Sequence, residues 1–247
     1  MKKNVLEIHD LTVTYDAKPV LWDIELTLPQ KELIAIVGPN GAGKTTLLKS
    51  IIGLLKPISG TITFLQDGLP IKNMKNKIGY VPQGESIDWD FPTTVFDVVL
   101  MGRYGHIGWI KKPGPKDKEL TLQILDKVGM MPYKDRQIRQ LSGGQQQRVF
   151  LARALVQNAN IYLLDEPFKG VDIKTEKVII HLLKELQAQG KTVIVVHHDL
   201  PTVANYFSWV TFINQKIIAN GPVTEVFTES IINQTYQGSD SSKRMRS

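Results

Sequence analysis

Gly38-Pro39-Asn40-Gly41-Ala42-Gly43-Lys44-Thr45 is the stretch that decides the fold, because it has the spacing G-x-x-x-x-G-K-[ST] of a phosphate-binding loop. It follows an apolar run at 32–37 and precedes apolar residues at helical spacing over 44–55, so strand, loop and helix come in the order that the motif requires. A glycine-rich turn with an exposed lysine is the alternative, and it does not explain these flanks.

The residue types of this loop suit a nucleotide and its metal ion. Glycines let backbone N–H groups close around phosphate oxygens, and the start of the helix favours negative charge. Lys44 is expected to reach the β and γ phosphates, and Thr45, followed by Thr46, offers a hydroxyl to Mg²⁺. ATP and Mg²⁺ are therefore the expected ligands.

The rest of the chain alternates strands with helices. Apolar runs between turn residues over 5–28 predict a layer of small strands and hairpins. Buried strands are predicted at 161–164 and 192–196, and helices at 94–101, 116–128, 145–156 and 175–189. This alternation predicts an α/β fold with a parallel sheet, and the aromatic, glycine and proline residues of 84–115 predict a partly helical insertion.

Composition narrows the class of protein. The chain has 247 residues, 42% of them hydrophobic, which is enough for a substantial core. No stretch reaches the roughly 20 apolar residues of a membrane-spanning helix, and the start lacks a secretory signal, so a cytosolic location is expected. The absence of cysteine excludes disulfides and thiolate chemistry. The net charge is +6, but the basic residues are scattered, which favours a solvated surface over a nucleic-acid groove.

Two carboxylates follow the predicted strand at 161–164. Asp165 and Glu166 would emerge at the carboxyl edge of the sheet, where open α/β folds bind ligands. We expect Asp165 to hold Mg²⁺ and Glu166 to polarise the water that attacks the γ phosphate. A solvated acidic turn is the alternative, and the phosphate-binding loop makes it the weaker one.

A second anion-binding segment stands before the predicted helix at 145–156. In Leu141-Ser142-Gly143-Gly144-Gln145 the serine is placed as a helix N-cap, and the two glycines permit close backbone approach. This segment would contribute to ATP binding if it closed over the side of the γ phosphate that the first loop leaves exposed. Spacing does not say whether it does so from the same chain or from another. An ordinary helix cap is the alternative.

Together these three motifs resemble the nucleotide-binding subunits of ABC transporters, over nearly the whole chain. The resemblance implies a P-loop NTPase with a RecA-like core, in which two copies pair head to tail and each pentapeptide completes the other copy's ATP site. It also implies the roles of four further residues: Tyr15 stacks on adenine, Gln83 senses Mg²⁺ and the permease, Asp172 lies between the two sites, and His198 contacts the γ phosphate. Without this resemblance, we would interpret Tyr15 as a core tyrosine, Gln83 as an exposed glutamine and Asp172 as a helix-capping aspartate.

Two details qualify these roles. His197 and His198 leave a strand on opposite sides, so they do not form a metal cluster, and His197 is expected to be structural. Lys169 in Lys169-Gly-Val-Asp172 departs from the small residues of many relatives and puts a charge near the expected dimer seam.

The domain organisation follows the same resemblance. One ATPase domain is expected over 1–237, with a nucleotide-binding core at 1–84 and 157–237, a helical subdomain at 85–156 and a disordered tail at 238–247. The chain would be peripheral on the inner face of the cell membrane, bound there through the permease.

The prediction of the cargo depends on a resemblance to one branch of this family. Residues 85–104, the glycine-rich loop after them and 165–172 resemble the manganese, zinc and iron importer branch, closest to its manganese members. This implies a permease that grips the region from Gln83 to Trp109 and an extracytoplasmic metal-binding protein. The alternatives are an ABC ATPase for another cargo and a soluble ABC ATPase of DNA repair or translation, although the chain has neither a long coiled-coil insertion nor two fused cassettes. A small-molecule kinase would not explain Leu141 to Gln145.

Overall fold

The computed structural model describes residues 2–15, 18–71, 77–84, 92–108 and 111–236. The chain divides into two compact units, the first made of Met1–Met74 with Gly190–Ser247 and the second of Lys75–Gln189. Each unit is described by itself. The predicted boundaries of the nucleotide-binding core and helical subdomain remain a prediction, and the predicted tail lies outside the described residues.

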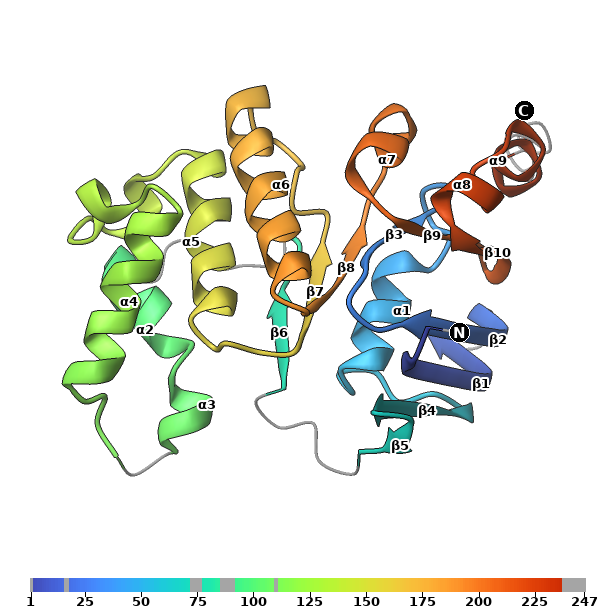
Figure 1. Cartoon of the computed structure of the whole chain (residues 1–247), viewed down its shortest axis with the longest axis horizontal. Helices are drawn as coiled ribbons and strands as arrows, with labels where there is room; N and C mark the ends of the chain where they lie inside the picture. Colours follow the sequence, from blue (N-terminus) through green and yellow to red (C-terminus); the bar gives the residue numbers. More distant parts are fainter. Residues whose placement is uncertain (1, 16–17, 72–76, 85–91, 109–110, 237–247) are drawn as a thin grey trace. The chain divides into compact units, whose positions relative to one another are not determined.

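The first unit combines two sheets with helices (Figure 1). Its strands are β1 (Asn4–Tyr15), β2 (Lys18–Pro29), β3 (Leu33–Val37), β4 (Ser59–Gln66), β5 (Leu69–Pro70), β8 (Thr192–Val196), β9 (Trp209–Asn214) and β10 (Lys216–Pro222). Its helices are α1 (Lys44–Ile51), α7 (Leu200–Tyr206), α8 (Val223–Val226) and α9 (Glu229–Tyr236).

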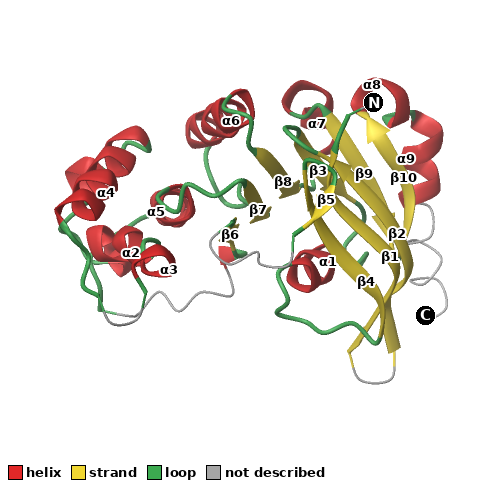
Figure 2. Ribbon diagram, turned by 60° about the horizontal axis from the view of Figure 1, so that its bottom comes forward, coloured by secondary structure: helices red, strands yellow, loops and turns green. Residues whose placement is uncertain are grey.

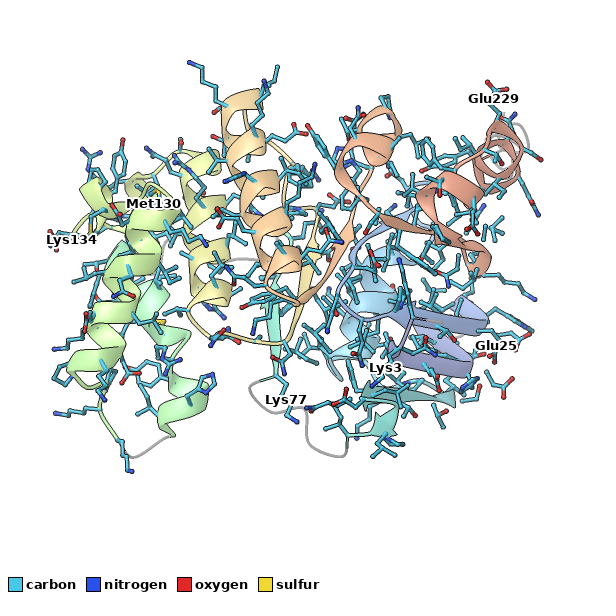
Figure 3. The ribbon with its side chains drawn as sticks, viewed as in Figure 1. Lys3, Glu25, Lys77, Met130, Lys134 and Glu229 are labelled. Atoms are coloured by element: carbon cyan, nitrogen blue, oxygen red, sulfur yellow. The ribbon has the colours of Figure 1, made fainter. Side chains whose placement is uncertain are left out.

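An antiparallel sheet opens the chain, in the strand order β2-β1-β4-β5. This confirms the predicted β layer, but β1 and β2 have 12 residues each and are not small strands. Their pairing is interrupted by register shifts, and Asp10 and Asp23 both adopt φ 52°. These irregularities break the apolar alternation, which is why the sequence suggested shorter strands. Glu25, labelled in Figure 3, accepts a hydrogen bond from the Asp10 N–H at 2.6 Å.

Parallel strands hold the core of the first unit. β3 pairs in parallel with β8 on one side and with β9 on the other, and β10 lies antiparallel to β9. Every residue of β3 and β8 is buried, as expected of strands covered on both faces. The Asn220 side-chain amide donates to the Thr27 carbonyl at 2.8 Å, which links β10 to β2 of the antiparallel sheet.

The second unit contains parallel strands and most of the long helices (Figure 2). Its strands β6 (Ile78–Val81) and β7 (Ile161–Asp165) pair in parallel. Its helices α2, α4 and α5 pack against one another. Its helices and 3₁₀ turns are α2 (Val95–Met101), α3 (Tyr104–Ile107), α4 (Pro115–Lys127), η2 (Met131–Tyr133), η3 (Ile138–Gln140), α5 (Gly143–Leu155) and α6 (Ile173–Ala188).

Glycines and caps fix most helix ends close to their predicted positions. Thr94 caps α2, and Gly129 and Gly190 follow α4 and α6 with positive φ. Helix α1 was predicted to reach residue 55 but ends at Ile51, because Gly53 adopts φ 76° and bends the chain away. Met130, labelled in Figure 3, is fully buried after α4. Among the described residues, no helix is both long and apolar enough to cross a membrane.

Candidate active site

The phosphate-binding loop joins β3 to α1 in the first unit, and two of its glycines are required by packing. A Cβ on Gly38 would lie 2.0 Å from the Ile213 carbonyl oxygen of the neighbouring strand. Gly43 has φ 94°, and its Cβ would lie 2.4 Å from the Leu21 side chain. No L side chain fits either position without moving the backbone or a core residue, so the loop keeps its shape through glycine.

The start of α1 suits an anion. No side chain caps its N-terminus, and its first turn contains no acidic residue. Lys44 is only 7% exposed, and its Nζ donates to the carbonyl oxygens of Gly38 at 2.8 Å and Pro39 at 2.9 Å. The cation is therefore held over the loop's own backbone, beside the positive end of a helix dipole. Asn40 and Gly41 are exposed at the tip of the loop, and Ala42 and Thr46 are buried.

His198 lies at the same edge of the parallel sheet as this loop. Ile36 pairs with Val196, so the next residues along β3 and β8 bring Gly38 and His198 to the same level. His198 is exposed, whereas His197 is 1% exposed and hydrogen-bonds through Nε2 to the Thr202 hydroxyl at 2.7 Å. Burial, with a smaller effect of His198, lowers the pKa of His197 to about 4. The two histidines therefore differ in surroundings as predicted, and the contact of His198 with phosphate stays a prediction.

Tyr15 ends β1 in the same unit, and its side chain is 48% exposed. An exposed aromatic ring can stack on a purine, whereas a core tyrosine could not. The structure thus excludes the core alternative for Tyr15. Stacking on adenine remains a prediction.

The second unit gathers the carboxylates. Val81 of β6 pairs with Leu164 of β7, and the same register continues to place Gln83 opposite Glu166. The Gln83 amide donates to Glu166 Oε2 at 3.1 Å. Parallel pairing therefore brings together two residues that are far apart in the sequence and that serve one predicted function.

Asp165 is fully buried at the end of β7. Burial raises the pKa of the nearby Tyr80 hydroxyl to about 12, and the negative charge of Asp165 adds to that rise. An ionised carboxylate in such a place requires a compensating partner, and a divalent cation is one. The buried carboxylate of Asp165 thus fits the Mg²⁺ ion that the sequence predicts.

The pentapeptide at 141–145 forms a capping box. The Gln145 N–H donates to Ser142 Oγ at 3.4 Å, and the Ser142 N–H donates to Gln145 Oε1 at 2.9 Å, which confirms Ser142 as the N-cap of α5. A Cβ on Gly144 would lie 3.6 Å from the Thr175 side chain, an ordinary contact. The segment therefore packs beside the start of α6.

Asp172 is the N-cap of α6. Its carboxylate accepts from the Thr175 N–H at 2.9 Å and from the Thr175 hydroxyl at 3.0 Å. These hydrogen bonds, led by the one from the backbone, lower the pKa of Asp172. The helix-capping alternative is thus observed, and the role of Asp172 between two ATP sites remains a prediction.

Sequence reasoning missed three neighbours of these residues. The Tyr80 hydroxyl lies close enough to Asp165 to feel its charge, Tyr236 of α9 lies beside the Gly38 backbone, and Lys169 forms an ion pair with Glu166 at 3.7 Å. Burial raises the pKa of Tyr236, and the Gly38 backbone opposes that rise. Only the i, i+3 spacing of Glu166 and Lys169 could have been noticed in the sequence.

Within the first unit the structure thus assembles the loop from Gly38 to Thr46 with His198, and Tyr15 belongs to the same unit. The second unit assembles Gln83, Asp165 and Glu166, and also Ser142 to Gln145 with Asp172. Both sets contain residues that the sequence predicts to act on phosphate or on its metal ion.

Known proteins are similar to this chain in sequence. The family model for ABC transporters matches residues 21–169. A zinc transport system ATP-binding protein, TroB, from Treponema pallidum (strain Nichols) is 53% identical over 96% of this chain and 88% of its own length. A manganese transport system ATP-binding protein, MntB, from Bacillus subtilis (strain 168) is 55% identical over 94% of this chain and 92% of its own length.

Solved structures agree with the fold. A nucleotide-free ATP-binding cassette from an ABC transporter has a TM-score of 0.78 at 26% identity, covering 94% of both chains. A cassette solved as a dimer in a post-hydrolysis state, with ADP and phosphate bound, has a TM-score of 0.76 at 29% identity, covering 88% of this chain and 98% of the other. The predicted α/β fold of a P-loop NTPase is confirmed.

Proposed function

The chain belongs to the ATP-binding family of ABC transporters, and we propose that it powers uptake of a divalent metal ion, with manganese as the cargo. As a member of this family it binds and hydrolyses ATP. The cargo is supported by its relatives, which are the ATP-binding proteins of manganese and zinc transport systems. The prediction of the cargo from the sequence depends partly on residues 85–91, which lie outside the described residues.

One observation carries the hydrolytic part of the proposal: Glu166 directly follows the buried Asp165, and its carboxylate is held by the Gln83 amide. We assign Glu166 as the general base. The water oxygen forms a bond to the γ phosphorus, the bond to the bridging oxygen breaks with its electron pair leaving on ADP, and Glu166 accepts the water proton. Lys44 would stabilise the charge on the phosphates, and His198 would contact the γ phosphate.

Mg²⁺ supplies charge neutralisation to the β and γ phosphates when it is bound. Thr45, Asp165 and Gln83 are the residues that would hold it. Asp165 brings a buried carboxylate and Thr45 a partly buried hydroxyl, and oxygen donors of this kind are what Mg²⁺ prefers.

The partners are part of the same proposal. Two copies would pair head to tail around ATP, with Ser142 to Gln145 of one copy completing the site of the other. The pair would bind a membrane-spanning permease at the inner face of the cell membrane, and an extracytoplasmic metal-binding protein would deliver the cargo. Removal of the bridging γ phosphate would let the copies part, which drives the permease.

Glu166→Gln tests the hydrolytic assignment. The substitution keeps the size and the hydrogen-bonding capacity of the side chain but removes the base, so turnover should fall by about 10²-fold or more. ATP affinity should remain and an ATP-bound dimer should accumulate, measured by nucleotide binding and light scattering. The exposed Glu225→Gln is the control and should hydrolyse ATP like the wild type. Wild-type turnover in Glu166→Gln would refute the base assignment.

Metal accumulation tests the cargo. Deleting the gene for this chain from its host should abolish manganese uptake and leave zinc uptake unchanged. Both are measured as the amount of cell-associated metal. A chain carrying Glu166→Gln should not restore uptake, whereas Glu225→Gln should. If deletion removed zinc uptake alone, the cargo would be zinc. Unchanged accumulation of every divalent metal would reject metal transport altogether.

A further inference from the structure

Lys169 belongs to a turn that begins at Glu166. The Lys169 N–H donates to the Glu166 carbonyl at 3.2 Å, with Pro167 at the second position of the turn, where its fixed φ is favourable. Glu166 itself adopts φ 52°, in the left-handed region that few residues with a Cβ occupy. This backbone brings residues 166 and 169 to one side of the turn, and Lys169 Nζ lies 3.7 Å from Glu166 Oε2.

The Gln83 amide and the Lys169 ammonium approach the same carboxylate oxygen. Both contacts are to Oε2, at 3.1 Å from Gln83 and 3.7 Å from Lys169. The two groups come from different segments, Gln83 from the loop that follows β6 and Lys169 from the turn that follows β7. A carboxylate held at one oxygen by two groups has a restricted rotation, so its other oxygen, Oε1, takes a defined direction.

We propose that Lys169 is a positioning residue for hydrolysis, which together with Gln83 holds Oε2 of Glu166 so that Oε1 accepts the proton of the attacking water. This rests on the proposed role of Glu166 as the base. The Glu166 side chain is 17% exposed and that of Lys169 is 47% exposed, so solvent weakens the ion pair without removing it. Lys169 acts on the orientation of the base, through its ion pair with Glu166.

The size of the effect follows from this exposure. Partly exposed ion pairs of this kind correspond to about a two- to fivefold change in rate. Lys169→Ala should therefore lower kcat of the full-length chain two- to fivefold and leave KM for ATP unchanged, because binding does not involve Glu166. The difference from the wild type should shrink as NaCl is raised, since salt screens an exposed pair.

Two further substitutions separate charge from packing. Lys169→Arg keeps the positive charge and should restore most of kcat, whereas Lys169→Met keeps the length of the side chain without the charge and should behave like Lys169→Ala. Lys177→Ala removes the same charge from an exposed position of α6 and should leave kcat unchanged. Equal kcat for the Arg and Met variants would overturn the proposal, as would a kcat of Lys169→Ala equal to or above that of the wild type.

A double-mutant cycle with Glu166→Gln tells the two proposals apart. If Lys169 acts through Glu166, adding Lys169→Ala to Glu166→Gln should not lower the residual turnover further. A further fall of the same size would mean that Lys169 acts elsewhere and would overturn the positioning role while the base assignment stood. Wild-type turnover in Glu166→Gln alone would instead remove the base, and with it the role of Lys169.

Discussion

Two adjacent histidines that follow β8 have very different surroundings. His197 and His198 are neighbours, yet one is buried against Phe207 with ring centroids 5.2 Å apart and the other is exposed at the edge of the sheet. The alternation of side chains at the end of β8 produces this difference. A histidine kept neutral by burial makes stability depend on pH.

Lowering the pH should therefore destabilise the protein through His197. Its pKa is about 4 in the folded chain against an ordinary value of 6.5, so between these values the unfolded chain binds a proton that the folded chain does not. The contribution of His197 is full above pH 6.5 and falls as the pH drops towards 4. Between pH 7 and pH 5 the loss is roughly 2 kcal/mol.

Urea unfolding at pH 7 and pH 5 measures this effect. His197→Gln retains an amide that can hydrogen-bond to Thr202 but cannot take up the proton, so its free energy of unfolding should fall less between the two pH values than that of the wild type. Identical losses in both proteins would show that His197 is not the group responsible.

At the scale of elements, glycines serve two different purposes. Gly38 is required by the fold, because its Cβ would collide with the Ile213 carbonyl of β9. Gly144 in the first turn of α5 is not, since its Cβ would make only ordinary contacts with Thr175 and Val171. Gly144 is therefore explained by a group that approaches the start of α5, and we propose that this group is the γ phosphate of ATP bound to a partner copy.

Gly144→Ala should separate stability from activity. Alanine favours helix over glycine, so the free energy of unfolding without nucleotide should stay the same or rise, by up to about 1 kcal/mol. ATP hydrolysis should fall, because the added methyl group obstructs close approach to the backbone at the start of α5. Gly129→Ala is the contrasting variant, since φ 67° makes alanine destabilising there. A parallel loss of stability and activity in Gly144→Ala would assign this glycine to the fold.

The whole molecule is expected to work as a pair of copies, and the pentapeptide at 141–145 gives a way to separate pairing from nucleotide binding. Ser142 is exposed at the start of α5, and it belongs to the second unit, whereas the loop around Lys44 belongs to the first. A bulky charge at Ser142 should therefore leave the chain's own phosphate-binding loop intact.

Ser142→Arg, introduced together with Glu166→Gln, should prevent the ATP-dependent dimer while changing ATP affinity little. The added side chain would occupy the place of the partner's γ phosphate and add bulk where the two copies meet. Light scattering with and without ATP measures pairing, and fluorescent nucleotide titration measures binding. Ser230→Arg makes the same change at an exposed position of α9, and this variant should pair normally. Dimer formation by Ser142→Arg would contradict the head-to-tail arrangement.

Local patterns predicted much of this molecule. The motif at 38–45, the buried strands and most helix ends could be predicted because each depends on neighbouring residues: apolar period, capping side chains and glycines with positive φ. The strands β4, β5, β6, β9 and β10 and the helices α7 to α9 were not predicted. Their apolar residues form short or irregular runs, and their pairing partners lie far away in the sequence.

The sequence by itself determined the α/β fold and predicted the chemistry of the site, because spacing within one loop or at one strand end fixes which groups emerge together. Only the tertiary structure decided which distant residues meet. The register of β6 on β7 places Gln83 at Glu166, beside the carboxylate oxygen that Lys169 also approaches, and the neighbouring β9 carbonyl makes Gly38 indispensable. Such contacts depend on strand pairing and backbone geometry, which no local pattern of residue types encodes.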